Sequence, residues 1–233
     1  MYISAFFKLY VYESLQYRMT SQSQLGQDLE VLRLYNNKKN GYFVEIGASD
    51  GIEYSNTYLL EKKYGWTGIC VEALPDRFSA LEKNRPRSTC IHTAVFNETG
   101  KKVPFVIAHA NDVLSGIPYY IGPQHIQTVR KNMTTIEMET MTLNDILRKA
   151  NAPNHIDYLS LDTEGTELLI LQCVDFSTYS FGIIDVEHNY LEPARTDIRN
   201  LLTSNGYEFL RENEFDDSYI HSSVAATIQR DTA

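Results

Sequence analysis

Apolar residues along the chain recur with two different spacings, and these spacings predict alternating strands and helices. Short apolar runs that end in turn residues predict buried strands, whereas apolar residues three or four positions apart predict one face of a helix. Strands are predicted over residues 42–46, 67–72, 88–95, 103–108, 136–141, 156–161, 181–186, 207–210 and 224–228. Helices are predicted around Leu29, Leu59 and Phe78, and over residues 143–150, 167–173 and 193–206.

This order of elements predicts an α/β fold with a mainly parallel sheet and helices on both faces, because each helix returns the chain across the sheet. The alternation fails between residues 97 and 141, where glycine and proline breaks and paired tyrosines separate two predicted strands. We interpret this segment either as a lid or acceptor pocket over the strand ends, or as a surface hairpin. Residues 21–233 are expected to form a single domain with an insertion around residues 97–141.

The first 20 residues have a different pattern, in which Phe6, Tyr10 and Tyr17 are interleaved with Lys8 and Arg18. Aromatic residues on two sides predict a helix that docks on another surface. We therefore expect residues 1–20 to form an aromatic helix or a linker that contacts a preceding domain or a second copy of the chain.

Composition and charge narrow the function. The 233 residues are 43% hydrophobic, which is enough for one buried sheet with surrounding helices. The net charge of -9 argues against binding to nucleic acid or anionic membranes, because both require a basic surface. Cys70, Cys90 and Cys173 lack metal-ligand spacing and are interpreted as buried, reduced thiols. No membrane-spanning run and no signal peptide is recognisable, so a cytoplasmic protein is expected.

The most informative stretch is residues 42–51, YFVEIGASDG. Gly47 and Gly51 bracket a turn in which the backbone either approaches a ligand closely or simply reverses direction. The spacing of Glu45, Gly47 and Gly51 differs from the Gly-x-Gly-x-x-Gly pattern of dinucleotide-binding proteins and fits an S-adenosylmethionine loop better. Glu72 follows the next strand, about twenty residues after the turn, where doubly wound folds place a carboxylate that binds ribose.

Further polar residues follow the two strands that come after the predicted insertion. Asp162 and Glu164 follow one strand, and Glu187 and His188 follow the next. The carboxyl ends of parallel strands meet at one edge of the sheet, where ligands bind, although any single acid there also serves to cap a helix. We hypothesise that Asp162 and Glu187, with His188, bind Mg²⁺ or Mn²⁺ or orient an alkoxide, and that His188 is the general base.

Several short motifs together resemble the FkbM family of S-adenosylmethionine-dependent methyltransferases. They are SQLGQD at 23–28, the glycine loop at 43–51, SNT at 55–57, GWTGICVE at 65–72 and residues 156–167. The resemblance implies a class I methyltransferase fold, with a seven-stranded Rossmann-like sheet whose last strand is antiparallel. It also implies transfer of a methyl group to a hydroxyl oxygen, often that of a sugar.

The resemblance further implies which residues bind the cofactor. The expected cofactor-binding residues are Gln24, Gln27, Asp28, Glu45, Gly47, Ala48, Ser49, Asp50, Gly51, Ser55, Asn56, Glu72, Ala73, Ala94, Asn111, Asp112 and Asp162. Within this set Glu72 is expected to bind the ribose and Ala94 to flank the adenine. The expected catalytic residues, Asp162, Glu164 and His188, do not come from the resemblance but from the polar groups that follow the two strands described above.

Three alternatives are open. A nicotinamide-dependent oxidoreductase would use a similar sheet but would need the other glycine spacing. The acceptor could be a small molecule other than a sugar, although a deoxyhexose hydroxyl in a glycan or glycoconjugate is the leading prediction. A non-catalytic adaptor could retain the methyltransferase core and act through its aromatic N-terminal segment.

Overall fold

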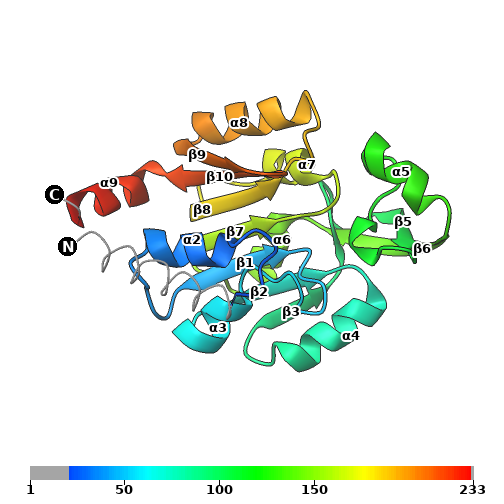
Figure 1. Ribbon diagram of the computed structural model, residues 1–233, viewed down its shortest axis with the longest axis horizontal. Coiled ribbons are helices and arrows are strands. Elements are labelled where there is room, and N and C mark those ends of the chain that lie inside the picture. The colour runs from blue at the N-terminus through cyan, green and yellow to red at the C-terminus, as the bar shows by residue number, and fades with distance from the viewer. Residues whose placement is uncertain (1–20, 232–233) are drawn as a thin grey trace, which may run out of the picture.

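A seven-stranded sheet forms the centre of the protein in a computed structural model that describes residues 21–231 (Figure 1). The strands lie in the order β3-β2-β1-β7-β8-β10-β9. Their bounds are β1 (Tyr42–Ile46), β2 (Thr67–Glu72), β3 (Thr89–His92), β7 (His155–Leu161), β8 (Ser180–Glu187), β9 (Tyr207–Asn213) and β10 (Asp216–His221). The first five strands in this order, from β3 to β8, are parallel to one another. Strand β10 is antiparallel to both of its neighbours, β8 and β9. The predicted α/β fold with an antiparallel last strand is confirmed.

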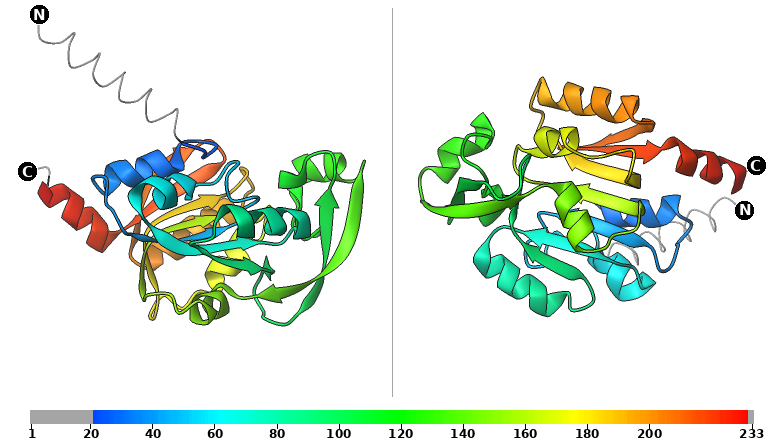
Figure 2. Two further views of the ribbon diagram at one scale, coloured as in Figure 1. Left: turned by 90° about the horizontal axis from the view of Figure 1, so that it is seen from below. Right: turned by 180° about the vertical axis from the view of Figure 1, so that it is seen from behind.

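Helices cover both faces of this sheet (Figures 1 and 2). They are α6 (Leu143–Lys149), α7 (Glu167–Gln172) and α8 (Ala194–Ser204) on one face, and α2 (Gln27–Leu34), α3 (Tyr58–Tyr64) and α4 (Pro75–Asn84) on the other. Successive strand residues point to opposite faces of the sheet. Val44 therefore packs in the core under α6, α7 and α8, and Phe43 packs in the core under α2, α3 and α4. Burial on both faces explains why β1 is an almost continuous apolar run.

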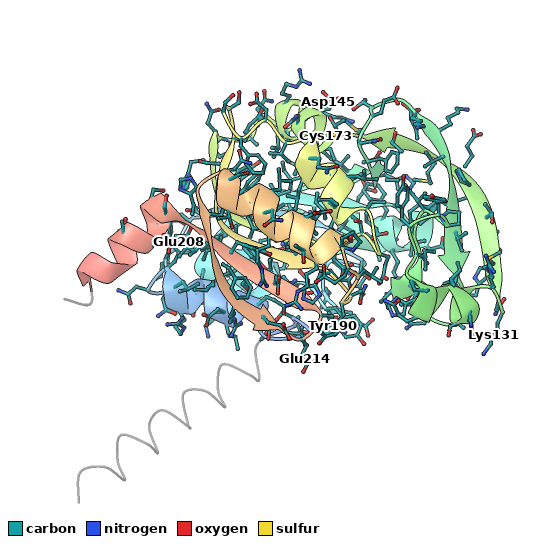
Figure 3. The ribbon with its side chains drawn as sticks, turned by 90° about the horizontal axis from the view of Figure 1, so that it is seen from above. Lys131, Asp145, Cys173, Tyr190, Glu208 and Glu214 are labelled. Atoms are coloured by element: carbon teal, nitrogen blue, oxygen red, sulfur yellow. The ribbon has the colours of Figure 1, made fainter. Side chains whose placement is uncertain are left out.

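Between α4 and α6 the chain forms a second, three-stranded sheet in the order β4-β6-β5. Its elements are β4 (Ala94–Val95), β5 (Lys102–Ala108), the 3₁₀ helix η1 (Asp112–Leu114), α5 (Pro123–Val129) and β6 (Met133–Met141). Figure 2 shows this layer standing beside the main sheet, and Lys131 marks its outer end in Figure 3. Helix α5 is not predicted by the sequence pattern, because Gly122 and Pro123 suggest a break, whereas Pro123 here occupies the first turn of a helix.

The predicted strand over residues 224–228 is wrong. These residues belong to a helix, α9 (Ser222–Asp231), and the last strand is β10, which lies earlier in the chain. The sequence of β10, DDSYIH, is too polar to be recognised as a buried strand. Asp217 is nevertheless buried there, because its carboxylate accepts hydrogen bonds from Arg195 and Arg199.

The predicted N-terminal helix or linker, residues 1–20, lies outside the described residues. Within residues 21–231, no helix combines the length and the hydrophobicity that crossing a membrane requires. Cys70 is buried, Cys90 and Cys173 are partly buried, and all three are free thiols.

Candidate functional site

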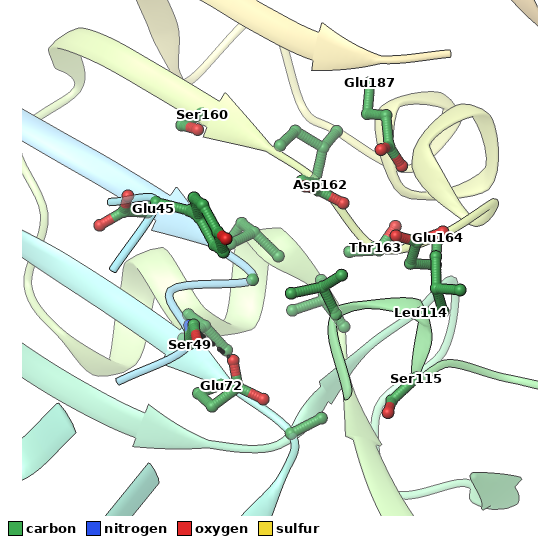
Figure 4. A pocket seen from close by; sticks show the side chains of 18 of the residues that line it. Glu45, Ser49, Glu72, Leu114, Ser115, Ser160, Asp162, Thr163, Glu164 and Glu187 are labelled. Atoms are coloured by element: carbon green, nitrogen blue, oxygen red, sulfur yellow. Dashed lines mark hydrogen bonds between the residues drawn. The ribbon is translucent and has the colours of Figure 1, made fainter. Parts of the chain in front are cut away.

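A cavity of about 320 Å³ lies at the carboxyl ends of β1, β2, β7 and β8, and residues of the three-stranded sheet also line it (Figure 4). Small-molecule sites commonly have volumes of about 300–1,000 Å³. The polar lining includes Gln24, Gln27, Glu45, Ser49, Asn56, Glu72, Ser160, Asp162, Glu164, Asp185, Glu187 and Asp216. The cavity therefore occupies the edge of the sheet where doubly wound folds bind their ligands.

The turn after β1 requires glycine at two positions. Gly47 has a φ of +82°, and an added Cβ atom would overlap the backbone carbonyl oxygen of Asp162, which directly follows the neighbouring strand β7. Gly51 has a φ of +79°, and its added Cβ would lie 2.6 Å from side-chain atoms of Leu81 and Arg85. Between them Ser49 has a φ of 49°, which is uncommon for a residue with a side chain. This backbone is held in an unusual shape at the cavity wall, as is frequent at ligand sites.

Glu72 connects the end of β2 to this turn. Its Oε2 accepts a hydrogen bond from the backbone N–H of Ser49 at 2.8 Å, and its Oε1 accepts one from Leu74 N–H at 2.7 Å. Burial raises the pKa of the Glu72 carboxyl, and the two backbone donors oppose that shift. A carboxylate oxygen can accept more than one hydrogen bond, so both oxygens keep acceptor capacity for a ligand hydroxyl.

The buried carboxylate of Glu45 accepts hydrogen bonds from the residues that immediately precede α3. Its carboxylate accepts hydrogen bonds from Ser55 Oγ at 3.0 Å, Asn56 N–H at 2.6 Å and Thr57 Oγ1 at 2.6 Å. The buried guanidinium of Arg85 lies 3.5 Å from the same carboxylate. Glu45 therefore fixes the loop between β1 and α3, and this also explains why Ser55 faces inward.

Gln27, at the start of α2, and Asn56, in the loop between β1 and α3, both line the cavity. Gln27 Nε2 donates to Asp216 Oδ2 at 2.7 Å, and Asn56 Nδ2 donates to Ser160 Oγ at 2.9 Å. Asn56 Oδ1 is buried and has no hydrogen-bond partner among the described residues, so it is a free acceptor at the cavity wall. The expected cofactor residues that do not line the cavity are Asp28, Ala48, Asp50, Gly51 and Ser55.

Asp28 lies beside the cavity in a buried position, where its Oδ1 accepts hydrogen bonds from Ser21 Oγ and Leu29 N–H. Burial raises its pKa from 3.8 to about 6. The folded state therefore binds this proton more tightly than the unfolded state, and the associated stability is lost as the pH rises from 4 through 6.

An Asp28→Asn variant is expected to unfold less readily than the natural protein at pH 8, by on the order of 1 to 3 kcal/mol, and to resemble it at pH 4.5. The amide keeps the Oδ1 acceptor but carries no charge to bury. Denaturant unfolding at the two pH values measures the difference. An equal effect of the substitution at both pH values would show that Asp28 ionises normally.

An apolar wall closes the far side of the cavity. Ala73 follows β2, Ala94 begins β4, Phe105 lies on β5, and Ile117 lies between η1 and α5. The two alanines were expected to lie here, whereas Phe105 and Ile117 were missed because nothing in their local pattern shows which side of the insertion faces the main sheet. A planar, weakly polar group fits such a wall.

Asn111 and Asp112 also line the cavity, as expected, but Asp112 is engaged by Arg77 of α4. Arg77 donates to the two Asp112 oxygens at 2.6 and 2.9 Å. The same guanidinium lies 3.9 Å from Asp50 and 3.7 Å from Glu53. Arg77 thus ties the insertion to the loop after β1, and Asp112 has its main partner within the protein.

Acidic side chains crowd the remaining side of the cavity. Carboxylate oxygens of Asp162, Glu167 and Glu187 lie within 4.8 Å of one another. Asp162 is accessible to water in the cavity, but burial and the neighbouring Glu167 raise its pKa to about 7. Burial and Asp162 raise the pKa of Glu164 to about 9, and burial with the other acids raises the pKa of Glu187 well above its usual value. This side of the cavity disfavours an anionic ligand.

Glu164 is directed into the cavity by an unusual backbone. It has a φ of 59°, and the next residue, Gly165, packs so closely on Tyr120 that an added Cβ would overlap the Tyr120 carbonyl oxygen. His125 of α5 approaches Glu164, with Nδ1 3.3 Å from Oε2. His125 was missed because a helix was not predicted there; its only signal is that it lies in the insertion.

His188 does not reach the cavity. Its ring is buried, Nδ1 accepts a hydrogen bond from Tyr190 N–H at 2.9 Å, and Nε2 lies 3.4 Å from Asp217. Arg195 also donates a hydrogen bond to Asp217. Burial alone would raise the pKa of Asp217, but its contacts with His188 and Arg195 lower that pKa well below the usual range. Tyr190, which follows β8, lies at the surface (Figure 3). The structure thus brings Asp162 and Glu187 together, but places His188 apart from them.

Comparison with family models gives one match. The sequence profile of the methyltransferase FkbM domain matches residues 45–209. No curated protein sequence matches the chain significantly. Among solved structures, FkbM methyltransferase from Methylobacillus flagellatus KT is 12% identical with a TM-score of 0.49, covering 78% of this chain and 44% of its own.

Two other similar structures are those of a precorrin methyltransferase and of TrmK. Precorrin-6y C5,15-methyltransferase from Geobacter metallireducens GS-15 is 11% identical, with a TM-score of 0.47 and coverage of 83% of this chain and 85% of its own. TrmK from M. capricolum, solved with S-adenosyl-homocysteine, is 12% identical, with a TM-score of 0.42 and coverage of 82% and 66%. The chain therefore spans two thirds or less of the TrmK and FkbM chains.

The profile match includes the features that build the cavity. It contains the glycine turn, Glu72 and the acids Asp162, Glu164 and Glu187. The match extends over more than half of the chain. The chain therefore belongs to the FkbM family of S-adenosylmethionine-dependent methyltransferases.

Proposed function

We propose that the protein methylates a hydroxyl oxygen of a sugar, with a deoxyhexose in a glycan or glycoconjugate as the leading acceptor. The observation that carries this proposal is that Asp162 and Glu164 converge on the same cavity as Gly47 and Glu72. The acids supply hydrogen-bond acceptors and, where protonated, donors for the hydroxyl groups of a neutral polyol, and a further negative charge beside them would be disfavoured. A neutral sugar fits this side of the cavity better than an anionic acceptor.

The residues present fit S-adenosylmethionine. The glycine turn leaves space where a side chain would otherwise stand, Glu72 offers acceptors for a ribose diol, and Ala73 and Ala94 leave room beside Phe105 for adenine. Asn56 Oδ1, a buried acceptor without a partner, suits an ammonium group. When bound, the cofactor supplies an electrophilic methyl group on a sulfonium.

The chain's own residues then have three tasks. The glycine turn and Glu72 fix the orientation of one reactant, while the acidic side positions the other, and such alignment accounts for much of the acceleration of an in-line transfer. Glu164 accepts the proton of the acceptor hydroxyl, because a carboxyl with a raised pKa is a stronger base than an exposed one. Phe105 and Ile117 restrict water on the opposite wall.

The alternatives make different predictions. A small-molecule acceptor other than a sugar would use the same cavity, and an adaptor would bind no cofactor. The decisive experiment is mass spectrometry of deoxyhexose glycosides, glycans and non-sugar alcohols after incubation with S-adenosylmethionine labelled in the methyl group. Label on a sugar hydroxyl supports the proposal, whereas label confined to a non-sugar product, or to nitrogen or carbon, would contradict it.

We also propose how the chain is organised and where it is located, from its elements, its cavity lining and its cysteines. Residues 21–233 form one methyltransferase domain in which residues 97–141 are an insertion that contributes to the acceptor side. Cytoplasmic localisation agrees with the three free thiols, because a reducing compartment keeps them reduced. We also propose that a divalent cation assists the reaction.

Replacing Glu72 with glutamine is expected to weaken the affinity for S-adenosylmethionine about 10- to 100-fold, with little effect on turnover at saturation. The amide nitrogen cannot accept a hydrogen bond, so either Ser49 N–H or Leu74 N–H loses its acceptor and the ribose partner is lost with it. Titration calorimetry measures the affinity. Asp76→Asn, an exposed acid on α4, is the matched control and should bind normally. An unchanged affinity for Glu72→Gln would remove Glu72 from the site.

A further inference from the structure

We propose that Asp162, Glu167 and Glu187 bind one divalent cation at the base of the cavity. Each residue contributes one carboxylate oxygen, and these oxygens lie within 4.8 Å of one another. Oxygens on opposite sides of a Mg²⁺, Mn²⁺ or Ca²⁺ ion, with bonds of about 2.0–2.6 Å, are about 4–5 Å apart. The three oxygens are therefore close to the separations found around one shared ion.

Glu187 gives independent evidence for a missing partner. Only 7% of this residue is exposed, yet its Oε2 is buried and has no hydrogen-bond partner within residues 21–231. Figure 4 shows Glu187, at the end of β8, pointing toward the same part of the cavity as Asp162. An unpaired buried carboxylate oxygen is costly, and a cation would satisfy it.

Within residues 21–231, no basic side chain forms an ion pair with Asp162, Glu167 or Glu187. Asp216, which is paired with Glu187 across the sheet, adds a further carboxyl to the same side. A cation would relieve repulsion that no lysine or arginine in the described part of the chain relieves.

Glu167 is the best oriented of the three ligands. Its Oε1 accepts hydrogen bonds from Thr163 N–H at 2.7 Å, Thr163 Oγ1 at 2.8 Å and Gly165 N–H at 3.1 Å. These donors hold the carboxylate in one position and connect it to the loop that carries Glu164. Outer hydrogen bonds of this kind usually orient the ligands of a metal site. The ligand set differs from the predicted one, because Glu167 takes the place of His188.

An all-carboxylate site favours hard cations, so Mg²⁺ or Mn²⁺ is the expected class. Its use in catalysis rests on the function proposed above: the ion would lie next to the acceptor hydroxyl and stabilise an alkoxide. Binding of the ion does not depend on that function, and it can be measured without cofactor or acceptor.

The test is a Mn²⁺ titration of the full chain after removal of metals, followed by electron paramagnetic resonance of the free ion at pH 8. The natural protein is expected to bind one Mn²⁺, and Glu187→Gln and Asp162→Asn should each weaken binding at least about tenfold. Glu137→Gln, which alters an exposed acid that pairs with Lys102, is the matched control and should bind as the natural protein does. Circular dichroism confirms that each variant is folded.

Two results would overturn the site: no Mn²⁺ bound by the folded natural protein, or equal binding by the natural protein and both cavity variants. Because this titration contains neither cofactor nor acceptor, its failure leaves the proposed methyl transfer standing. Conversely, tight Mn²⁺ binding by a protein that methylates no sugar would support the cation site and contradict the proposed acceptor.

Discussion

Replacing Gly47 with alanine is expected to weaken the affinity for S-adenosylmethionine by about 100-fold or more, which corresponds to roughly 3 kcal/mol. A residue with a side chain pays about 1–2 kcal/mol in the left-handed conformation that Gly47 adopts. The added Cβ would also overlap the carbonyl oxygen of Asp162, so the ends of β1 and β7 would have to separate. Both strand ends line the cavity, and their separation would displace the turn and Asp162 together.

Gly100 provides a matched control for this substitution. It has a φ of +78°, but nothing lies within 4 Å of an added Cβ atom, and Gly100 does not line the cavity. Gly100→Ala therefore carries the backbone cost without the overlap, and its affinity should stay within about twofold of the natural protein. Titration calorimetry gives both affinities, and thermal unfolding shows whether each variant is folded. A folded Gly47→Ala variant with normal affinity would exclude the turn from the cofactor site.

Replacing Glu164 with glutamine is expected to lower turnover about 100- to 10,000-fold while leaving the affinity for S-adenosylmethionine within a few fold. Glutamine keeps the size of the side chain and its place near His125, but it cannot take a proton from the acceptor. Burial raises the pKa of Glu164 to about 9, so the basic form is populated only as the pH approaches that value. Without added divalent cation, the natural protein's rate should therefore rise from pH 7 to 9, and the rate of the variant should not follow this rise.

Glu53→Gln is the control for this experiment. Glu53 also lines the cavity but is exposed and lies next to Arg77, so its loss should change turnover less than about threefold. Both rates are measured with the acceptor identified by mass spectrometry and with saturating cofactor. A Glu164→Gln variant that keeps the natural turnover and pH profile would exclude Glu164 as the base.

The strand ends were predictable from the sequence because each feature there has a local signal. Gly47 follows a buried apolar run, and Glu72 follows the next one, so their spacing is enough to place them at one edge of a parallel sheet. The same argument brings Asp162 and Glu187 together, and the structure places their carboxylates at the same corner. Periodicity carries this information because these strands are buried on both faces.

The position of His188 could not be predicted in the same way. It follows β8 directly, but successive residues near a strand end point in opposite directions, so Glu187 faces the cavity and His188 faces Asp217. Asp217 itself lies on β10, a strand that the polar sequence concealed. The partner that decides the orientation of His188 is thus distant in sequence.

The side chains that the insertion contributes to the cavity could not be predicted from the sequence either. Phe105, Ile117 and His125 line the cavity from the insertion, where the chain has left the main sheet after β3 and β4 pairs with β6. Local patterns in residues 97–141 indicate two strands but not how they dock against the main sheet. Tertiary packing determines which of their side chains face the ligand. The acceptor side of the cavity consequently depends on long-range structure far more than the cofactor side does.

The cavity at the ends of β1, β2 and β7 is the proposed binding site of S-adenosylmethionine. Titration calorimetry of the folded full chain with S-adenosylmethionine, repeated in the presence of S-adenosylhomocysteine, tests it most directly. We expect binding of one molecule of S-adenosylmethionine per chain, competition by S-adenosylhomocysteine, and loss of both signals in Gly47→Ala but not in Gly100→Ala. No heat with either compound, or binding that Gly47→Ala leaves unchanged, would contradict the account.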